Sequence, residues 1–152
     1  MSRFEDVTED VIDLVEYVRK EWFPELGSAK IKIMFDLKKR LSVGKVVLAR
    51  IQKSNEIMRY LTTEEADSEE GFDYFLYIDK MCWNNCEDGD KIRLLRHEFS
   101  HSWCDINTSN NPWKLQGHEI SDFHAEIERN QDDPRWAERC AELTLSLYEG
   151  QE

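Results

Sequence analysis

The chain has 152 residues, 40% of them hydrophobic, and a formal net charge of −12 at pH 7. This size predicts one domain over residues 1–152 with a sizeable core, and the hydrophobic content excludes a disordered chain. The negative charge argues against a general nucleic-acid binder because phosphate contacts need Lys and Arg. No apolar run approaches the ~20 residues that span a bilayer, so we expect a cytoplasmic protein with no membrane partner.

Two local features qualify this composition. The four cysteines, Cys82, Cys86, Cys104 and Cys140, lack the paired spacing of zinc knuckles, which favours reduced thiols in a cytosolic protein. Residues 30–53 carry eight Lys and Arg residues against a single acid. Such a block is usually the solvated face of strands, and a phosphate-facing patch is its alternative interpretation.

Periodicity along the chain predicts an α+β protein. Apolar residues recur at helical spacing in 6–22, where Asp6 and Glu9 resemble a capping box. Residues 30–35 alternate in polarity like a half-buried strand, and residues 72–83 are apolar on both faces. The predicted elements are a helix at 6–22, strands at 30–35, 46–51 and 72–83, an acidic loop at 62–71, a helix at 88–104, a loop at 105–116 and a helix at 134–148.

The predicted helix 88–104 carries the stretch His97-Glu98-Phe99-Ser100-His101. Residues four apart on a helix are neighbours, so the two histidines can bind one metal ion, and Glu98 can take a proton from metal-bound water. A purely structural helix would carry solubilising charge at these positions, so the pattern predicts a zinc-dependent hydrolase. The apolar stripe of this helix, nearly opposite the histidines, is expected at Ile92, Leu95, Phe99 and Trp103.

A catalytic zinc takes three protein ligands and one water, so one ligand is still to be assigned. His118 lies after an Asn-rich loop, at the mouth of a further helix, and is our first choice. The alternatives are the carboxylates of Glu119, Asp122 and Glu126, and the imidazole of His124. The candidate donors to the reaction's oxyanion are His124, Tyr74 and Tyr77.

These motifs together resemble those of the phage metallopeptidase family, small HExxH proteins that are similar in outline to SprT-like and other minimal zincins. The resemblance covers roughly residues 30–130 and is most specific at HExxH and at His118-Glu119-Ile120-Ser121-Asp122-Phe123. It implies a zincin-like fold with a small, mostly antiparallel sheet packed on the HExxH helix. It also implies zinc bound by His97, His101 and His118, with Glu98 as general base.

We therefore expect a zinc metalloendopeptidase that hydrolyses a peptide or protein substrate through zinc-bound water activated by Glu98. Two other classes stay open. One is a zinc-binding, DNA-associated module in which residues 30–53 contact phosphate, and steep salt dependence would favour it. The other is a protein-interaction module in which zinc only joins helices, and an open coordination position would argue against it.

Overall fold

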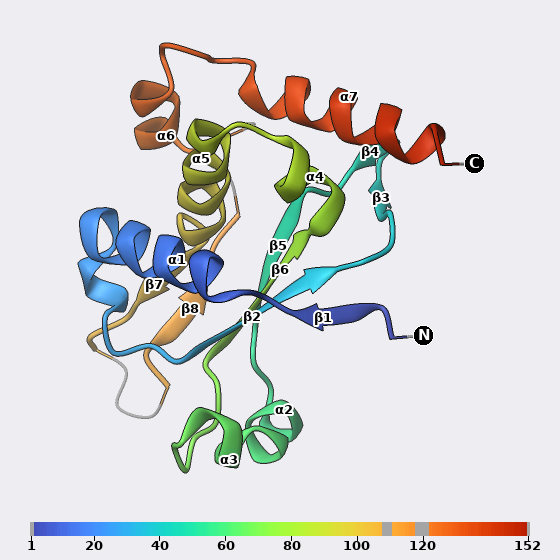
Figure 1. Cartoon of the computed structure of the whole chain (residues 1–152). Coiled ribbons are helices and arrows are strands. Elements are labelled where there is room, and N and C mark those ends of the chain that lie inside the picture. The colour runs from blue at the N-terminus through green and yellow to red at the C-terminus, as the bar shows by residue number, and fades with distance from the viewer. Residues whose placement is uncertain (1, 108–110, 118–121, 152) are drawn as a thin grey trace.

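A mixed four-stranded sheet forms the centre of the molecule (Figure 1). The computed structural model describes residues 2–107, 111–117 and 122–151. The strand order is β1-β2-β6-β5; β2 and β6 are parallel, and the other two pairings are antiparallel. The strands of the sheet are β1 (Phe4–Asp6), β2 (Ile31–Asp36), β5 (Ala49–Lys53) and β6 (Tyr74–Asp79). The expected mostly antiparallel sheet thus has two antiparallel pairings and one parallel pairing.

Seven α-helices and two small hairpins complete the described part of the chain. The hairpins pair β3 (Leu41–Ser42) with β4 (Lys45–Val46), and β7 (Ser102–Cys104) with β8 (Trp113–Leu115). The helices are α1 (Glu9–Trp22), α2 (Glu56–Leu61), α3 (Thr63–Ala66), α4 (Lys80–Asn85), α5 (Asp88–Phe99), α6 (His124–Arg129) and α7 (Trp136–Glu149), with a 3-10 turn at Pro24–Leu26. The α+β class is confirmed.

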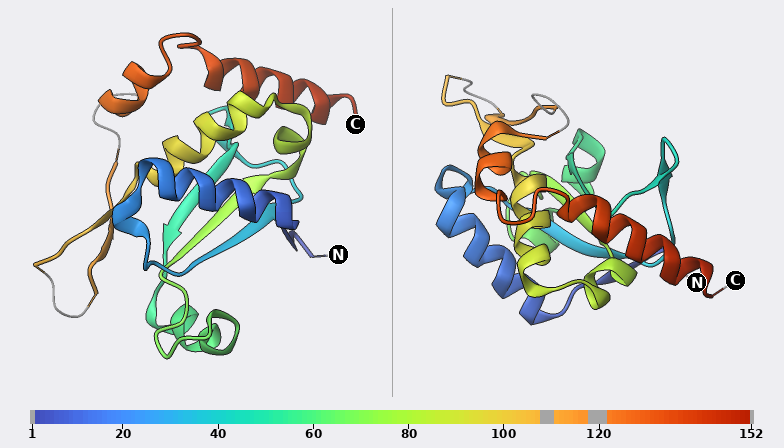
Figure 2. Two further views of the ribbon diagram at one scale, coloured as in Figure 1. Left: turned by 60° about the vertical axis from the view of Figure 1, so that its left-hand side comes forward. Right: turned by 90° about the horizontal axis from the view of Figure 1, so that it is seen from above.

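The hydrophobic core lies between one face of the sheet and the helices α1 and α5. Every residue of β6 is buried, as predicted, and its alternate side chains Tyr74, Leu76 and Ile78 belong to this core. The predicted stripe of α1 supplies Val11, Val15 and Val18 to it. Figure 2 shows α5 between α1 on one side and the segment α6–α7 on the other. The helix with the HExxH motif therefore contacts both the core and the C-terminal segment.

The helix that carries the motif is shorter than predicted. It ends at Phe99, and residues 102–104 form β7 instead of a further helical turn. The main-chain period changes from 3.6 to 2 at this point, so Ser102 points inward and Trp103, expected in the buried stripe, is 40% exposed. Leu95 and Phe99 are fully buried as expected.

Other predicted boundaries also need correction. Asp6 lies in β1 and not in a capping box, and Thr8 precedes the first turn of α1. The strand predicted at 72–83 ends at Asp79, because its carboxylate accepts a hydrogen bond from the Cys82 amide at 2.8 Å and begins α4. The acidic stretch 62–71, expected as a loop, contains α3, and the preceding α2 was not predicted. The strand expected at 46–51 is divided by residues 47–48 into the end of β4 and the start of β5. The loop expected at 105–116 contains β8.

Two further findings concern composition. All four cysteines are free thiols, with Cys82 and Cys140 buried. Within the described ranges, none of the helices has the length and apolar character needed to cross a bilayer.

Candidate metal centre

The C-terminal end of α5 brings the motif residues together. His97 and Glu98 lie in its last turn, and His101 follows the end of the helix. The amide of His101 donates to the carbonyl of Glu98 at 3.1 Å, which keeps His101 on the same turn. The two imidazole centroids are 5.4 Å apart, and one ligand atom from each of the three residues lies within 4.8 Å of the others. This is the one group of metal-ligating side chains so close together among the residues described.

Both imidazoles are oriented through Nδ1. The Nδ1 of His97 lies 2.8 Å from a carboxylate oxygen of Asp122, and the Nδ1 of His101 lies 2.7 Å from the main-chain carbonyl of Gln116. Carboxylates and carbonyls accept hydrogen bonds, so both imidazoles donate from Nδ1 and carry their lone pair on Nε2. Metal-ligating histidines are usually held in this way by a carboxylate or a carbonyl.

Aromatic side chains fix the planes of the same imidazoles. The buried ring of Phe123 meets His101 edge-on, with centroids 5.0 Å apart, and lies 5.7 Å from His97. The ring of Trp136, at the start of α7, lies 6.4 Å from His97. The two histidines at the end of α5 are thus held in position by residues that precede α6 and begin α7.

The carboxyl of Glu98 is buried beside the two histidines. Only 6% of this residue is exposed, and no described residue donates a hydrogen bond to its Oε2. Burial raises the pKa of Glu98 to about 7, although His97 and Arg50 oppose this rise. A carboxyl with a pKa near neutrality can accept a proton and later return it at physiological pH.

A cavity of about 360 Å³ opens directly at this group. His97, Glu98 and His101 form one wall of it. Its other walls come from residues 45–49, which run from β4 to the start of β5, and from the first turns of α7. The volume falls within the usual range for a ligand site, so a small chemical group has room next to the three side chains.

A buried ionic cluster holds α6 against α5. Glu126 is completely buried and accepts hydrogen bonds from Arg96 at 3.1 Å and from Arg129 at 2.6 Å. Arg96 also donates to Asn130 and lies over the ring of Trp22. Because Arg96 immediately precedes His97, this cluster fixes α6 close to the site. It thereby positions Asp122 and Phe123, which precede α6.

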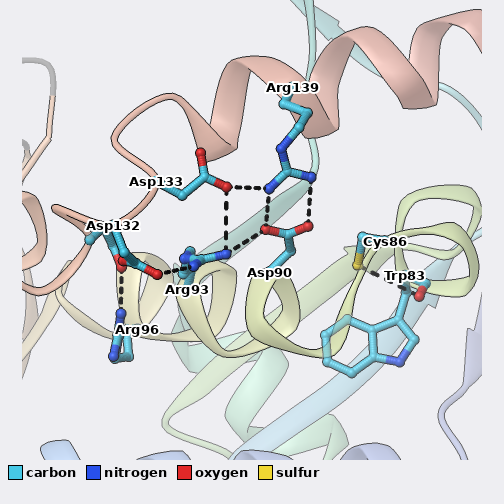
Figure 3. A network of polar contacts seen from close by, with 9 residues as sticks. Trp83, Cys86, Asp90, Arg93, Arg96, Asp132, Asp133 and Arg139 are labelled. Atoms are coloured by element: carbon cyan, nitrogen blue, oxygen red, sulfur yellow. Dashed lines mark hydrogen bonds and ion pairs between the residues drawn. The ribbon is translucent and has the colours of Figure 1, made fainter.

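A second ionic cluster attaches the start of α7 to the start of α5 (Figure 3). Arg139 donates to both oxygens of Asp90 at 2.9 and 2.7 Å and also to Asp133. Arg93 donates to Asp90 at 2.8 Å and to Asp132 at 2.7 Å. The two clusters together dock the whole segment from α6 to α7 on α5.

The candidates for the third ligand have different places in the structure. His118, our first choice, and Glu119 lie outside the described residues. Asp122 contacts the imidazole of His97, Glu126 forms the buried ion pairs with arginines, and His124 is exposed at the start of α6. Glu126 is therefore engaged in holding α6, and Asp122 has the geometry of an orienting group.

The tyrosines proposed as oxyanion donors are not at the site. The hydroxyl of Tyr74 donates to the carbonyl of Lys114 at 2.8 Å and supports the β7–β8 hairpin. Tyr77 alternates with the core residues of β6, and its ring contacts Arg40 and Phe4. Sequence reasoning also missed Gln116, whose carbonyl orients His101, because no pattern marks a main-chain acceptor 15 residues away.

Comparison with known proteins identifies a family. Residues 1–144 match the model of the family described as "Putative phage metallopeptidase". No curated protein and no protein of solved structure matches the chain.

Proposed function

The chain belongs to the putative phage metallopeptidase family, and on this premise we propose that it is a zinc-dependent metallopeptidase. The proposal assigns His97, His101 and His118 as zinc ligands and Glu98 as general base. The observation that carries it is the close group of two oriented imidazoles and one buried carboxyl at the wall of a cavity. A structural zinc site would not need that access.

The donor set fits zinc. Imidazole nitrogen is a common zinc ligand, and hydrogen bonds from Nδ1 place the lone pairs of His97 and His101 on Nε2. Zinc bound there would supply a Lewis acid that acidifies water and polarises a carbonyl group. Glu98 accepts the proton of the attacking water and passes it to the leaving amine, and its pKa near 7 suits both transfers.

The ends of the segment 117–122 support His118 as the third ligand. Its first end follows Gln116, which is bonded to the imidazole of His101, and its last residue, Asp122, is bonded to the imidazole of His97. The short segment containing His118 therefore begins and ends at the two histidines. Two ligands from one helical turn need a third from another part of the chain, and His118 is the histidine between Gln116 and Asp122.

A DNA-associated module receives less support from the basic segment 30–53. Lys32 forms ion pairs with Asp6 and Glu65, and Arg40 pairs with Asp36. These contacts neutralise part of the positive charge within the chain. Phosphate binding would need to break them.

The test compares Glu98→Gln with a matched surface variant, Glu128→Gln, in metal content and in cleavage of a mixed peptide library. Wild type should carry about one zinc per chain. Glu98→Gln should lose at least about 100-fold in cleavage rate while it keeps its zinc, because it removes the base and no ligand. Glu128→Gln should behave like wild type. Absence of zinc after reconstitution, or loss of zinc in Glu98→Gln, would contradict the assignment.

The third ligand is tested by a matched pair of histidine variants. His118→Ala should bind zinc far more weakly than His124→Ala, measured by competition with a chelator. Removal of a ligand has a greater effect than removal of an orienting partner, which lowers affinity about 10–100-fold. Equal zinc affinities of the two variants would mean that the third ligand is a carboxylate and not His118.

A further inference from the structure

A second cavity continues the cavity at the metal centre. It has a volume of about 380 Å³ and is lined by the tip of the β3–β4 hairpin and the middle of α7. The two cavities share four lining residues, which are Lys45, Val46, Glu138 and Ala141. Together they form one groove, here called the α7 groove, which leads from His97 and Glu98 to Leu145.

The α7 groove has an apolar floor and charged rims. Its floor is formed by Val46, Ala141 and Leu145, which are buried or half-buried. The exposed side chain of Lys45 lies on the hairpin rim, and the exposed side chains of Glu138 and Glu142 lie on the α7 rim. The rims thus carry both signs of charge, and the floor between them is apolar.

The length of the α7 groove matches a short extended peptide. Ala137 lines its end at the metal centre, and Leu145 lines its far end. These residues are eight positions apart on one helix, which corresponds to about 12 Å at 1.5 Å per residue. An extended chain advances about 3.3 Å per residue, so the groove accommodates three to four residues of a strand-like peptide.

We propose that the α7 groove binds an extended segment of the peptide substrate on one side of the scissile bond and selects a large apolar side chain there. The assignment of the occupant as substrate rests on the proposed function, because the groove is continuous with the cavity at Glu98. The apolar floor stabilises an aliphatic or aromatic side chain by removing it from water. An acidic side chain would lose its hydration against the same floor without gaining a partner there.

Binding is measured separately from cleavage by amide chemical-shift mapping of the full-length protein. The probes are blocked octapeptides of Ala and Ser with a single Leu, and the matched peptides with Asp in its place. The Leu peptide should bind at least about tenfold more tightly than the Asp peptide, as expected of an apolar pocket. Its shift changes should centre on Val46, Ala141 and Leu145. Equal affinities, or changes centred elsewhere, would overturn the proposal.

Two tryptophan variants on the same helix provide the matched comparison. Ala141→Trp fills the groove and should lower the affinity for the Leu peptide at least about tenfold. Leu143→Trp adds bulk at an exposed position outside the groove and should leave affinity within about twofold. If Ala141→Trp lowers the midpoint of thermal unfolding, Ala141→Leu serves as a variant with a smaller increase in side-chain volume. Unchanged affinity in both Ala141 variants contradicts the groove.

Cleavage of the same peptides distinguishes the two proposals. Groove binding without any cleavage supports the α7 groove and contradicts the proposed peptidase function. Cleavage with the same rate for the Leu and Asp peptides supports the function and overturns the groove.

Discussion

The two sides of α5 are held by different kinds of interaction. On one side, Leu95 and Phe99 are completely buried in the core with α1 and the sheet. On the other side, Asp90, Arg93 and Arg96 attach α6 and α7 through hydrogen-bonded ion pairs. The apolar side belongs to the hydrophobic core, whereas the ionic side consists of the cluster around Glu126 and the cluster around Asp90, of which Figure 3 shows the latter.

The two kinds of interaction have different consequences: the apolar side stabilises the fold, and the ionic side fixes the positions of side chains around His97. Apolar burial is non-directional and stabilises the fold in proportion to area. Hydrogen-bonded ion pairs contribute less net stability, because desolvation offsets their attraction, but they fix orientation. On this protein, the directional side is also the side that places Asp122, Phe123 and Trp136 around His97. We therefore expect damage to the apolar side to unfold the protein and damage to the ionic side to disturb the site first.

The largest expected effect comes from the apolar side. Phe99→Ala removes a fully buried ring that packs against Phe23 and should lower the free energy of unfolding by about 4 kcal/mol. Urea denaturation of the variant and of wild type measures this difference. Leu143→Ala, at an exposed position of α7, is the control and should change stability by less than about 0.5 kcal/mol. A loss below about 1 kcal/mol in Phe99→Ala would mean that the apolar side is not what holds α5.

The next effect comes from the ionic side. Glu126→Ala leaves Arg96 buried without its carboxylate partner and should lower the free energy of unfolding by about 3 kcal/mol. Unlike Phe99→Ala, it should increase hydrogen exchange in α6 well before global unfolding, since α6 is attached mainly through this cluster. The exposed Glu128 on the same helix provides the control, Glu128→Ala. If exchange in α6 stays at the wild-type rate, the cluster does not hold this helix.

Sequence periodicity predicted Leu95 and Phe99 on the apolar side of α5, and the HExxH spacing predicted the histidines away from that side. The stripe of α1, the strand β6 and the HExxH spacing are local patterns, and each can be read within one helical turn or strand. The end of α5 was predicted too late, because no Gly or Pro follows Phe99. The chain leaves the helix there to pair Cys104 with Trp113 across a hairpin, which local spacing does not encode.

Sequence periodicity could not predict the ion pairs of the ionic side. Asp90 and Arg139 are 49 residues apart, and Arg96 and Glu126 are 30 apart, so only the fold brings them together. Ala141 lies in the helix that was predicted at 134–148. Its small side chain leaves the α7 groove open, and periodicity cannot distinguish such a position from ordinary core packing.

A smaller effect is expected from Asp122, which precedes α6 and contacts the imidazole of His97. Asp122→Asn keeps the shape of the side chain but weakens the charged hydrogen bond to Nδ1 of His97. Zinc affinity, measured by chelator competition, should fall about 10–100-fold, while the metal-free protein should unfold within about 0.5 kcal/mol of wild type. A variant with wild-type zinc affinity would show that Asp122 does not orient the ligand. Loss of all zinc binding would instead make Asp122 a ligand.

The smallest effect concerns the pH dependence of the cluster that docks α7. Burial alone would raise the pKa of Asp90, but hydrogen bonds from Arg139 and Arg93 outweigh it and hold the pKa below the usual value. The folded pKa is thus lower than the unfolded one, so the stabilisation is present at neutral pH and is lost only as the pH falls below about 4. Arg139 is 42% exposed at its side chain, and solvent screening limits the effect to about 1 kcal/mol.

The measurement for Asp90 is a difference between two proteins. Other carboxylates also titrate in acid, so urea unfolding of wild type is compared with that of Asp90→Asn at pH 6 and at pH 3. The stability difference should be greater at pH 6 and shrink at pH 3, where the Asp90 carboxyl of the unfolded chain takes up a proton. A difference that does not change with pH would mean that the ion pairs do not attach α7. The docking of this helix would then come from its apolar contacts alone, and the two sides of α5 would be held in the same way.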